Sequence, residues 1–197
     1  MSDHKFSKAD AIKFGWETTT GNIGLLVLGW VIFIAIGMMP VVASDSWVVM
    51  VVAWVFDLVV WMGLIRMTLR FVDGDKGELA DLFSTFPLIL KFLVASIAVG
   101  VVVMVGFCLL VIPGIYWSIR LYMFPWVLVD KDVGPFEAMR QSWEMTRGSC
   151  WNFFLLALLL GAVNILGTIA LLIGLLITVP LSIVAVGYTY RRLEEVM

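Results

Sequence analysis

Charged residues are scarce in this chain. Only 14% of its 197 residues are Asp, Glu, Lys or Arg, whereas 62% are hydrophobic. A soluble domain carries about 25% charged and about 45–50% apolar residues. The composition therefore excludes an ordinary soluble globular protein, and it equally excludes a disordered chain or a disulfide-rich scaffold. We expect an all-α, polytopic membrane protein that forms a single domain over residues 1–197.

Histidine and cysteine are also scarce. The chain contains one histidine, His4, and two cysteines, Cys108 and Cys150. Ser–His–Asp or Cys–His catalysis needs a histidine beside the nucleophile, and a zinc site needs several His or Cys ligands. No P-loop, dinucleotide-binding or zinc-protease motif occurs. We therefore predict a non-enzymatic protein without metal or cofactor, and the net charge of −2 predicts no nucleic-acid partner.

Long hydrophobic runs are what the chain has instead. A membrane-spanning helix needs about 17–25 predominantly apolar residues. The last hydrophobic stretch is too long for one span, so it must turn near Gly167 to Gly174. The six predicted spans are about 22–39, 47–70, 88–111, 114–129, 151–171 and 174–190.

The basic residues lie on one side of these predicted spans. Every Lys and Arg except Arg120 lies before the first span, after the last one, or in and beside alternate loops. The remaining loops, around Ser44–Ser46, Ile112–Gly114 and Gly174, contain no cation. Cytoplasmic loops carry an excess of Lys and Arg, so we expect both termini in the cytoplasm.

Two stretches that each lead into a span resemble one another. Residues 11–21 and 138–148 share Ala, Trp, Glu, Thr and Gly at identical spacing. Apolar residues at spacing i, i+3, i+7, which share one helix face, add a fainter third copy. The three apolar stripes are Ala9, Ile12 and Trp16; Leu79, Leu82 and Phe86; and Phe136, Met139 and Trp143. This internal repeat predicts three hairpins, each preceded by a short amphipathic cytoplasmic helix.

These short helices have two interpretations. They are either plain elbows between hairpins or a cytoplasmic collar, in which the helices pack together and form a docking surface. The candidate interface residues of the collar are Trp16, Phe86 and Trp143. Pro87 departs from the pattern, because the other copies have Glu17 and Glu144 at that place.

Two charged side chains fall inside predicted spans. Asp57 lies ten residues into the second span, and Arg120 lies six residues into the fourth, which begins at the same outer face. At 1.5 Å per residue their depths differ by about 6 Å, which an arginine can bridge. Ionisable residues inside a membrane are candidate functional residues. The two form either a buried ion pair that fixes helix packing or a site where Asp57 binds protons or lines a solute path. A protonated Asp57 bonded to a neighbouring span is the third option.

The stretch from 112 to 154 is similar to a known family. It contains Ile-Pro-Gly-Ile at 112–115, Arg120, Pro-Trp-Val-Leu-Val-Asp at 125–130, and Ala-x-x-x-Ser-Trp at 138–143 before the next span. It resembles bacterial integral membrane proteins of unknown function, which are similar to the membrane domain appended to some glycerophosphoryl diester phosphodiesterases. The resemblance implies the bacterial cytoplasmic (inner) membrane. It implies no phosphodiesterase activity, because the catalytic barrel of those enzymes is a separate domain.

These observations favour a non-enzymatic scaffold or accessory protein of the inner membrane. It would bind lipid, a partner protein or a second copy of itself through its cytoplasmic helices. The alternative is a small transporter, channel or lipid-handling protein that uses the polar site at Asp57 and Arg120. A third hypothesis is an enzyme acting on lipid headgroups through Asp73, Asp75 and Asp81.

Overall fold

The computed structural model describes residues 6–42, 47–169 and 174–196, and these ranges contain helices and no strand. His4, the Ser44–Ser46 loop and the predicted end of the fifth span at Ala170 and Leu171 lie outside the described residues. The elements are α1 (Lys8–Gly21), α2 (Ile23–Val42), α3 (Trp47–Val72), the 3₁₀ turns η1 (Leu79–Leu82) and η2 (Phe86–Leu88), α4 (Ile89–Leu109), α5 (Val111–Leu121), α6 (Phe124–Lys131), α7 (Pro135–Met145), α8 (Cys150–Ile169) and α9 (Leu175–Glu194).

Four helical segments of the described chain are long and apolar enough to cross a membrane. They are Ile23–Pro40, Trp47–Val72, Leu79–Leu109 and Cys150–Ile169. They coincide with the first, second, third and fifth predicted spans, and the prediction of an all-α fold with long apolar helices is confirmed. The prediction of six such spans is wrong, because the fourth and sixth do not qualify.

The two failed spans have different physical causes. The fourth, 114–129, is divided, because α5 ends at Leu121 and α6 begins at Phe124 with Pro125 in its first turn. Proline suits that position because its missing N–H is not needed there. The sixth, 174–190, forms α9, which is less apolar than the other long helices because it contains Pro180 and ends in Arg191 and Arg192. Most residues of α9 between Pro180 and Leu193 are buried, so this helix belongs to the core of the described structure.

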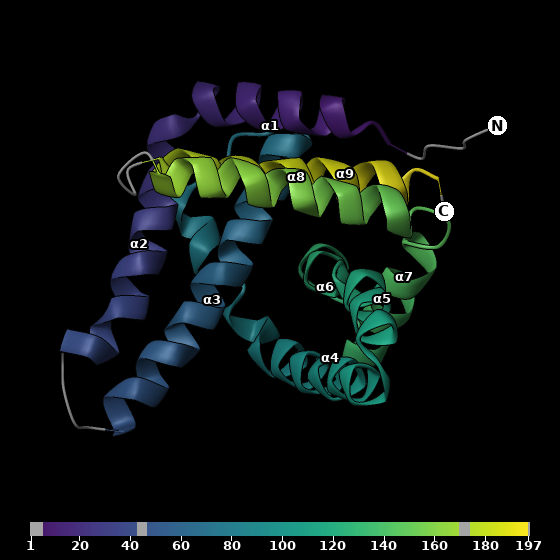
Figure 1. The fold of residues 1–197 in the computed structure, drawn as a ribbon. Coiled ribbons are helices and arrows are strands. Elements are labelled where there is room, and N and C mark those ends of the chain that lie inside the picture. The colour runs from purple at the N-terminus through teal and green to yellow at the C-terminus, as the bar shows by residue number, and fades with distance from the viewer. Residues whose placement is uncertain (1–5, 43–46, 170–173, 197) are drawn as a thin grey trace.

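The helices pack in two directions. Figure 1 shows α8 and α9 side by side and crosswise to the hairpin of α2 and α3, with α1 along α9. The centre of the fold lies where the C-terminal half of α3 meets α6 and α9. Met62, Val127 and Val184, one from each helix, are fully buried there. The ring of Trp126 stacks on Tyr190 with centroids 6.4 Å apart and joins α6 to α9.

Each of the three segments that precede a predicted hairpin lies against a backbone carbonyl oxygen of another helix, namely α3, α5 or α9. Thr85, between η1 and η2, donates a hydrogen bond of 3.0 Å to the carbonyl oxygen of Val59 in α3. Ser142 of α7 donates one of 2.9 Å to the carbonyl oxygen of Arg120 in α5. These bonds satisfy buried hydroxyl groups, which would be costly to leave unpaired.

The segment α1 also approaches a backbone carbonyl, that of Leu181 in α9, but through a glycine and therefore without a side-chain hydrogen bond. A Cβ on Gly15 would stand 2.9 Å from the carbonyl oxygen of Leu181. Gly15, Thr85 and Ser142 each directly precede one of the predicted collar residues. The contacted carbonyls belong to residues spaced 61 apart, namely Val59, Arg120 and Leu181.

The predicted middle amphipathic helix is absent. The chain from 79 to 88 instead forms the two 3₁₀ turns, with Pro87 in the first turn of η2. Short 3₁₀ turns do not continue easily because their hydrogen bonds are poorly aligned. The other two copies do form helices, α1 and α7.

The buried face of α1 differs from the predicted apolar stripe. Ala11, Gly15 and Thr19 are buried, whereas the ring of Trp16 is 55% exposed. Small residues face α9 because they let the two helix backbones come close together. The larger aromatic side chain is left on the outside.

Candidate functional site

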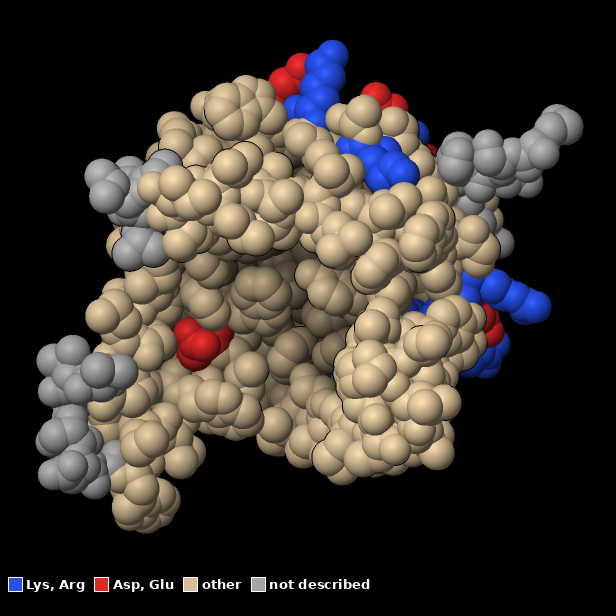
Figure 2. Space-filling model, in the orientation of Figure 1, with Lys and Arg blue, Asp and Glu red and all other residues tan. Residues whose placement is uncertain are grey.

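A cavity of about 540 Å³ lies between the α8–α9 pair and the helices that cross it. Its walls come from six helices, represented by Trp61 of α3, Val99 of α4, Leu121 of α5, Trp126 of α6, Leu160 of α8 and Ile183 of α9. Figure 2 shows a hollow at this place, with uncharged visible walls apart from an acidic patch beside α3. No charged side chain is among the described residues that line the cavity. Ligand pockets for small molecules commonly measure about 300–1,000 Å³ and are mostly apolar.

One polar group on the cavity wall joins α8 to α9. The amide nitrogen Nδ2 of Asn164 donates a 3.0 Å hydrogen bond to the hydroxyl of Ser182. That hydroxyl in turn donates 2.8 Å to the carbonyl oxygen of Thr178 in its own helix. Sequence reasoning did not select this pair as a site, although a lone asparagine in a long uncharged run was a signal for it.

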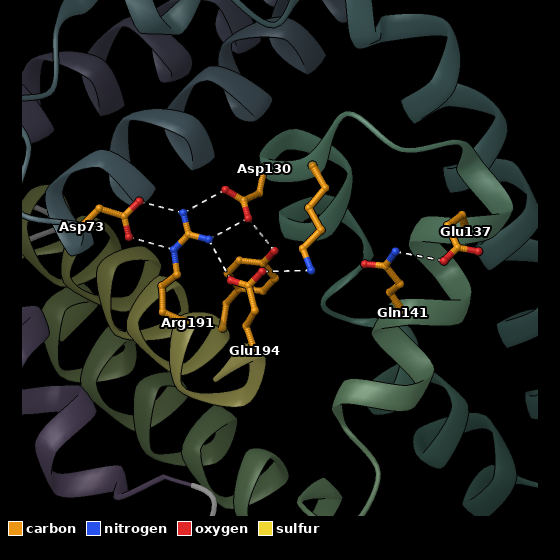
Figure 3. A network of polar contacts seen from close by, with 8 residues as sticks. Asp73, Asp130, Glu137, Gln141, Arg191 and Glu194 are labelled. Atoms are coloured by element: carbon orange, nitrogen blue, oxygen red, sulfur yellow. Dashed lines mark hydrogen bonds and ion pairs between the residues drawn. The ribbon is translucent and has the colours of Figure 1, made fainter. Parts of the chain in front are cut away.

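A cluster of charged side chains holds three helix ends together and lines a pocket of its own. Figure 3 shows Arg191 of α9 between Asp73, which follows α3, and Asp130 of α6. Its guanidinium makes two bonds to each carboxylate, at 2.8 and 2.7 Å to Asp73 and at 2.7 and 2.8 Å to Asp130. It also donates 2.8 Å to Glu194, which accepts a further ion pair of 2.9 Å from Lys131.

The surroundings of this cluster raise the pKa values of Tyr190 and of Arg191 itself. Burial, followed by the adjacent carboxylate of Asp130, raises the pKa of the Tyr190 phenol. The phenol therefore stays protonated and donates 2.8 Å to Asp130. Burial works against the charge of Arg191, but hydrogen bonds to Asp73, Asp130 and Glu194 outweigh it and raise the pKa of Arg191. No local pattern predicts this cluster, because its residues are far apart along the chain.

Asp57 lies on α3 against α2. A Cβ on Gly37 of α2 would stand 3.5 Å from the Oδ1 atom of Asp57. That oxygen is buried and accepts no hydrogen bond from the described residues. Because glycine leaves room there, α2 can pass close to the carboxyl group.

Arg120 lies elsewhere, at the junction of α5, α7 and α8. Its side chain is 3% exposed, and the guanidinium carbon lies 4.4 Å from the ring centroid of Trp143 and 5.7 Å from that of Tyr116. The Nη1 atom lies 3.8 Å from the sulfur of Cys150. Within the described part of the chain, no ion pair joins Arg120 to Asp57. The predicted pair does not form, because α5 directs Arg120 toward aromatic rings instead of toward α3.

This separation predicts that Asp57 and Arg120 act independently. The changes in unfolding free energy for Asp57→Asn and Arg120→Gln should add in the double variant to within about 0.5 kcal/mol, as for distant sites. Equilibrium unfolding in lipid nanodiscs would measure the three values. A double variant more stable than the sum of the single changes would instead show that the two side chains interact.

The predicted collar residues do not gather in one place. Trp16 and Phe86 are 55% and 59% exposed, on segments that pack on α9 and on α3 respectively. Trp143 is half-buried and covers Arg120. Trp16 and Phe86 therefore face outward, whereas Trp143 covers a buried side chain, and the collar stays a prediction.

Taken with the composition, the fold defines an all-helical protein with helices apolar enough to cross a membrane. Its sequence is 27% identical over 141 residues to the uncharacterized protein Rv2560 of Mycobacterium tuberculosis. That stretch covers 71% of this chain and 43% of the relative, so the chain spans less than half of the relative's length. No family model matches the chain, and no solved structure matches it.

Proposed function

We propose that this protein is a non-enzymatic integral protein of the bacterial inner membrane that binds a membrane lipid, with an acyl chain of the lipid inserted into the cavity. The cavity of about 540 Å³ between α3, α4, α5, α6, α8 and α9 carries this proposal. Its apolar walls match a hydrocarbon chain, and burial of apolar surface contributes about 25 cal/mol per Å².

The surroundings of the cavity supply such a ligand. The outer faces of the long helices expose large apolar side chains, for example Leu90, Ile97 and Met104 of α4. In a soluble protein such a continuous apolar surface would be a liability, whereas in a bilayer it faces lipid. The polar side-chain groups of the cavity wall are hydroxyls, two indole N–H groups and one amide, so the proposal assigns binding and no bond-making step.

The cation distribution supports an orientation with both termini in the cytoplasm. The cluster of Arg191, Asp73 and Asp130 then lies at the cytoplasmic ends of α3, α6 and α9. There it would hold the core helices together while the hairpins on the other side enclose the lipid.

The proposal predicts that a larger side chain introduced on the cavity wall displaces the lipid. A Cβ on Gly161 of α8 meets no atom within 4 Å, and Gly161 lines the cavity. Gly161→Phe should therefore fill the space without disturbing the helices and reduce the lipid-bound fraction at least tenfold. Native mass spectrometry of the protein released from nanodiscs measures that fraction.

Gly100→Phe provides the matched control. Gly100 lies on the exposed side of α4, and a Cβ there also meets no atom within 4 Å. It is not among the residues that line the cavity. We expect the Gly100 variant to retain lipid like the wild type. Equal lipid retention by both variants would contradict the proposed function.

Exposed aromatic residues favour a second candidate function, that of a scaffold. Trp16 and Phe86 stand outward on the segments next to the proposed cytoplasmic face. Aromatic residues are enriched at protein interfaces, so these two side chains would contact a partner protein. A stoichiometric protein partner in native mass spectra of the protein from its own membrane would favour the scaffold. A monomer that carries one defined lipid would favour lipid binding alone.

A further inference from the structure

The orientation of the Asn164 amide follows from the hydrogen bonds around it. The single hydrogen of the Ser182 hydroxyl is used in the bond to the carbonyl oxygen of Thr178. Ser182 can therefore only accept from Asn164, and it takes that bond from Nδ2. This fixes the amide nitrogen toward α9 and leaves the oxygen, Oδ1, to be paired by another group.

No such group exists among the described residues. The Oδ1 atom of Asn164 is buried and has no hydrogen-bond donor within the described chain. An unpaired buried acceptor is unfavourable, and buried polar groups in folded proteins are almost always paired. Asn164 is one of the residues that line the cavity, so the cavity is where a donor would come from.

The chemistry of the wall limits what that donor can be. A phosphate or a carboxylate offers only acceptors to Oδ1 and would meet no cation on the described wall. An ammonium group would meet no carboxylate there. An uncharged hydroxyl satisfies Oδ1 and carries no charge into an apolar cavity, where a charge would be costly.

We infer that the cavity selects a neutral lipid with a free hydroxyl, such as a diacylglycerol, whose hydroxyl donates to Oδ1 of Asn164. The inference rests on the proposed lipid-binding function and names the class of lipid. The hydroxyl reaches Oδ1 when the amide turns slightly about χ2, a torsion with a broad energy profile in asparagine. The acyl chain then lies along the apolar wall formed by residues such as Val99 and Leu160.

A pair of lipid probes that differ only at the hydroxyl tests this inference. The full-length protein is placed in phosphatidylcholine nanodiscs with equal amounts of 1,2-dipalmitoylglycerol and its 3-O-methyl ether, and the bound ratio is read by native mass spectrometry. We expect the free alcohol to bind about tenfold better, the ratio that corresponds to one net hydrogen bond. Equal binding of the two probes, or retention of phosphatidylcholine in place of both, would overturn the inference.

Three variants separate this inference from the proposed function. Asn164→Leu should bind both probes at the same level and lose the preference for the alcohol. Thr168→Val, which removes a hydroxyl bonded only within α8, should keep the preference. Gly161→Phe should exclude both probes. A preference that survives in Asn164→Leu would refute the role of Asn164, whereas undiminished binding by Gly161→Phe would refute the lipid-binding cavity itself.

Discussion

Replacement of Arg191 by methionine should lower the free energy of unfolding by about 2–3 kcal/mol. The change leaves Asp73 and Asp130 close together without their shared cation, while Glu194 keeps its bond to Lys131. Removal of one partner from a fully buried ion pair costs about 3–5 kcal/mol, and we expect less here because the Arg191 side chain is 24% exposed. For a chain of this size the loss corresponds to a fall in Tm of about 5–10 °C. Thermal unfolding in nanodiscs, followed by tryptophan fluorescence, measures it.

The neighbouring residue supplies the control. Arg192 pairs with Glu195 at 2.9 Å, but the two side chains are 47% and 60% exposed. Exposed ion pairs contribute about 0–1 kcal/mol, so Arg192→Met should leave Tm almost unchanged. Asp130→Asn should restore part of the stability of Arg191→Met, because it removes one unpaired carboxylate. Equal effects of the two arginine substitutions would show that the cluster does not hold the helix ends together.

The substitution Gly63→Ala should destabilise the protein by about 3 kcal/mol or more. A Cβ on Gly63 of α3 would coincide with the backbone of Leu82 in η1. A flexible side chain could move aside, but here the whole segment from 78 to 88 would have to leave α3. Overpacking of a rigid site costs about 1–3 kcal/mol and sometimes more, and the backbone contact places Gly63 at the upper end. The yield of monodisperse protein and its Tm report the effect.

Gly100→Ala is the comparison for that change. Gly100 also lies inside a helix, but a Cβ there meets no atom within 4 Å. Alanine in an exposed helix interior is favoured over glycine by about 0.5–1 kcal/mol. We therefore expect Tm to rise slightly in this variant. A similar loss of stability in both variants would mean that the close approach of η1 to α3 does not limit the fold.

Much of the fold follows from hydrophobic length alone. The runs at 22–39, 47–70, 88–111 and 151–171 predict four long helices, and α2, α3, α4 and α8 match them closely. The same criterion failed at 114–129 because α5 ends at Leu121 and Pro125 begins a new helix. It also failed at α9, which contains Pro180 and ends in two arginines and is therefore less apolar than the other long helices.

The internal repeat stays a prediction, and the contacts of Gly15, Thr85 and Ser142 support it. Sequence periodicity located the first of these segments, but the apolar stripe of α1 is not the face that packs on α9, because the small residues Ala11, Gly15 and Thr19 lie there. The middle segment lost its helix where Pro87 replaces the glutamate of the other copies.

The candidate site was less predictable than the fold. Depth along a helix suggested that Asp57 and Arg120 are neighbours, but depth says nothing about the direction in which each side chain points. Nothing local in the sequence connects Asp73 and Asp130 to Arg191, because the three residues meet only when α3, α6 and α9 pack together. The partnership of Asn164 with Ser182 likewise depends on how α8 and α9 lie together.

The packing of α1 against α9 also determines when α1 can reach its final position during synthesis. Lys8–Gly21 is synthesised before Leu175–Glu194, so the face of α1 with Ala11, Gly15 and Thr19 stays uncovered until α9 has been made. The close approach of Gly15 to Leu181 and Ala185 can therefore form only after the helices between them have been synthesised.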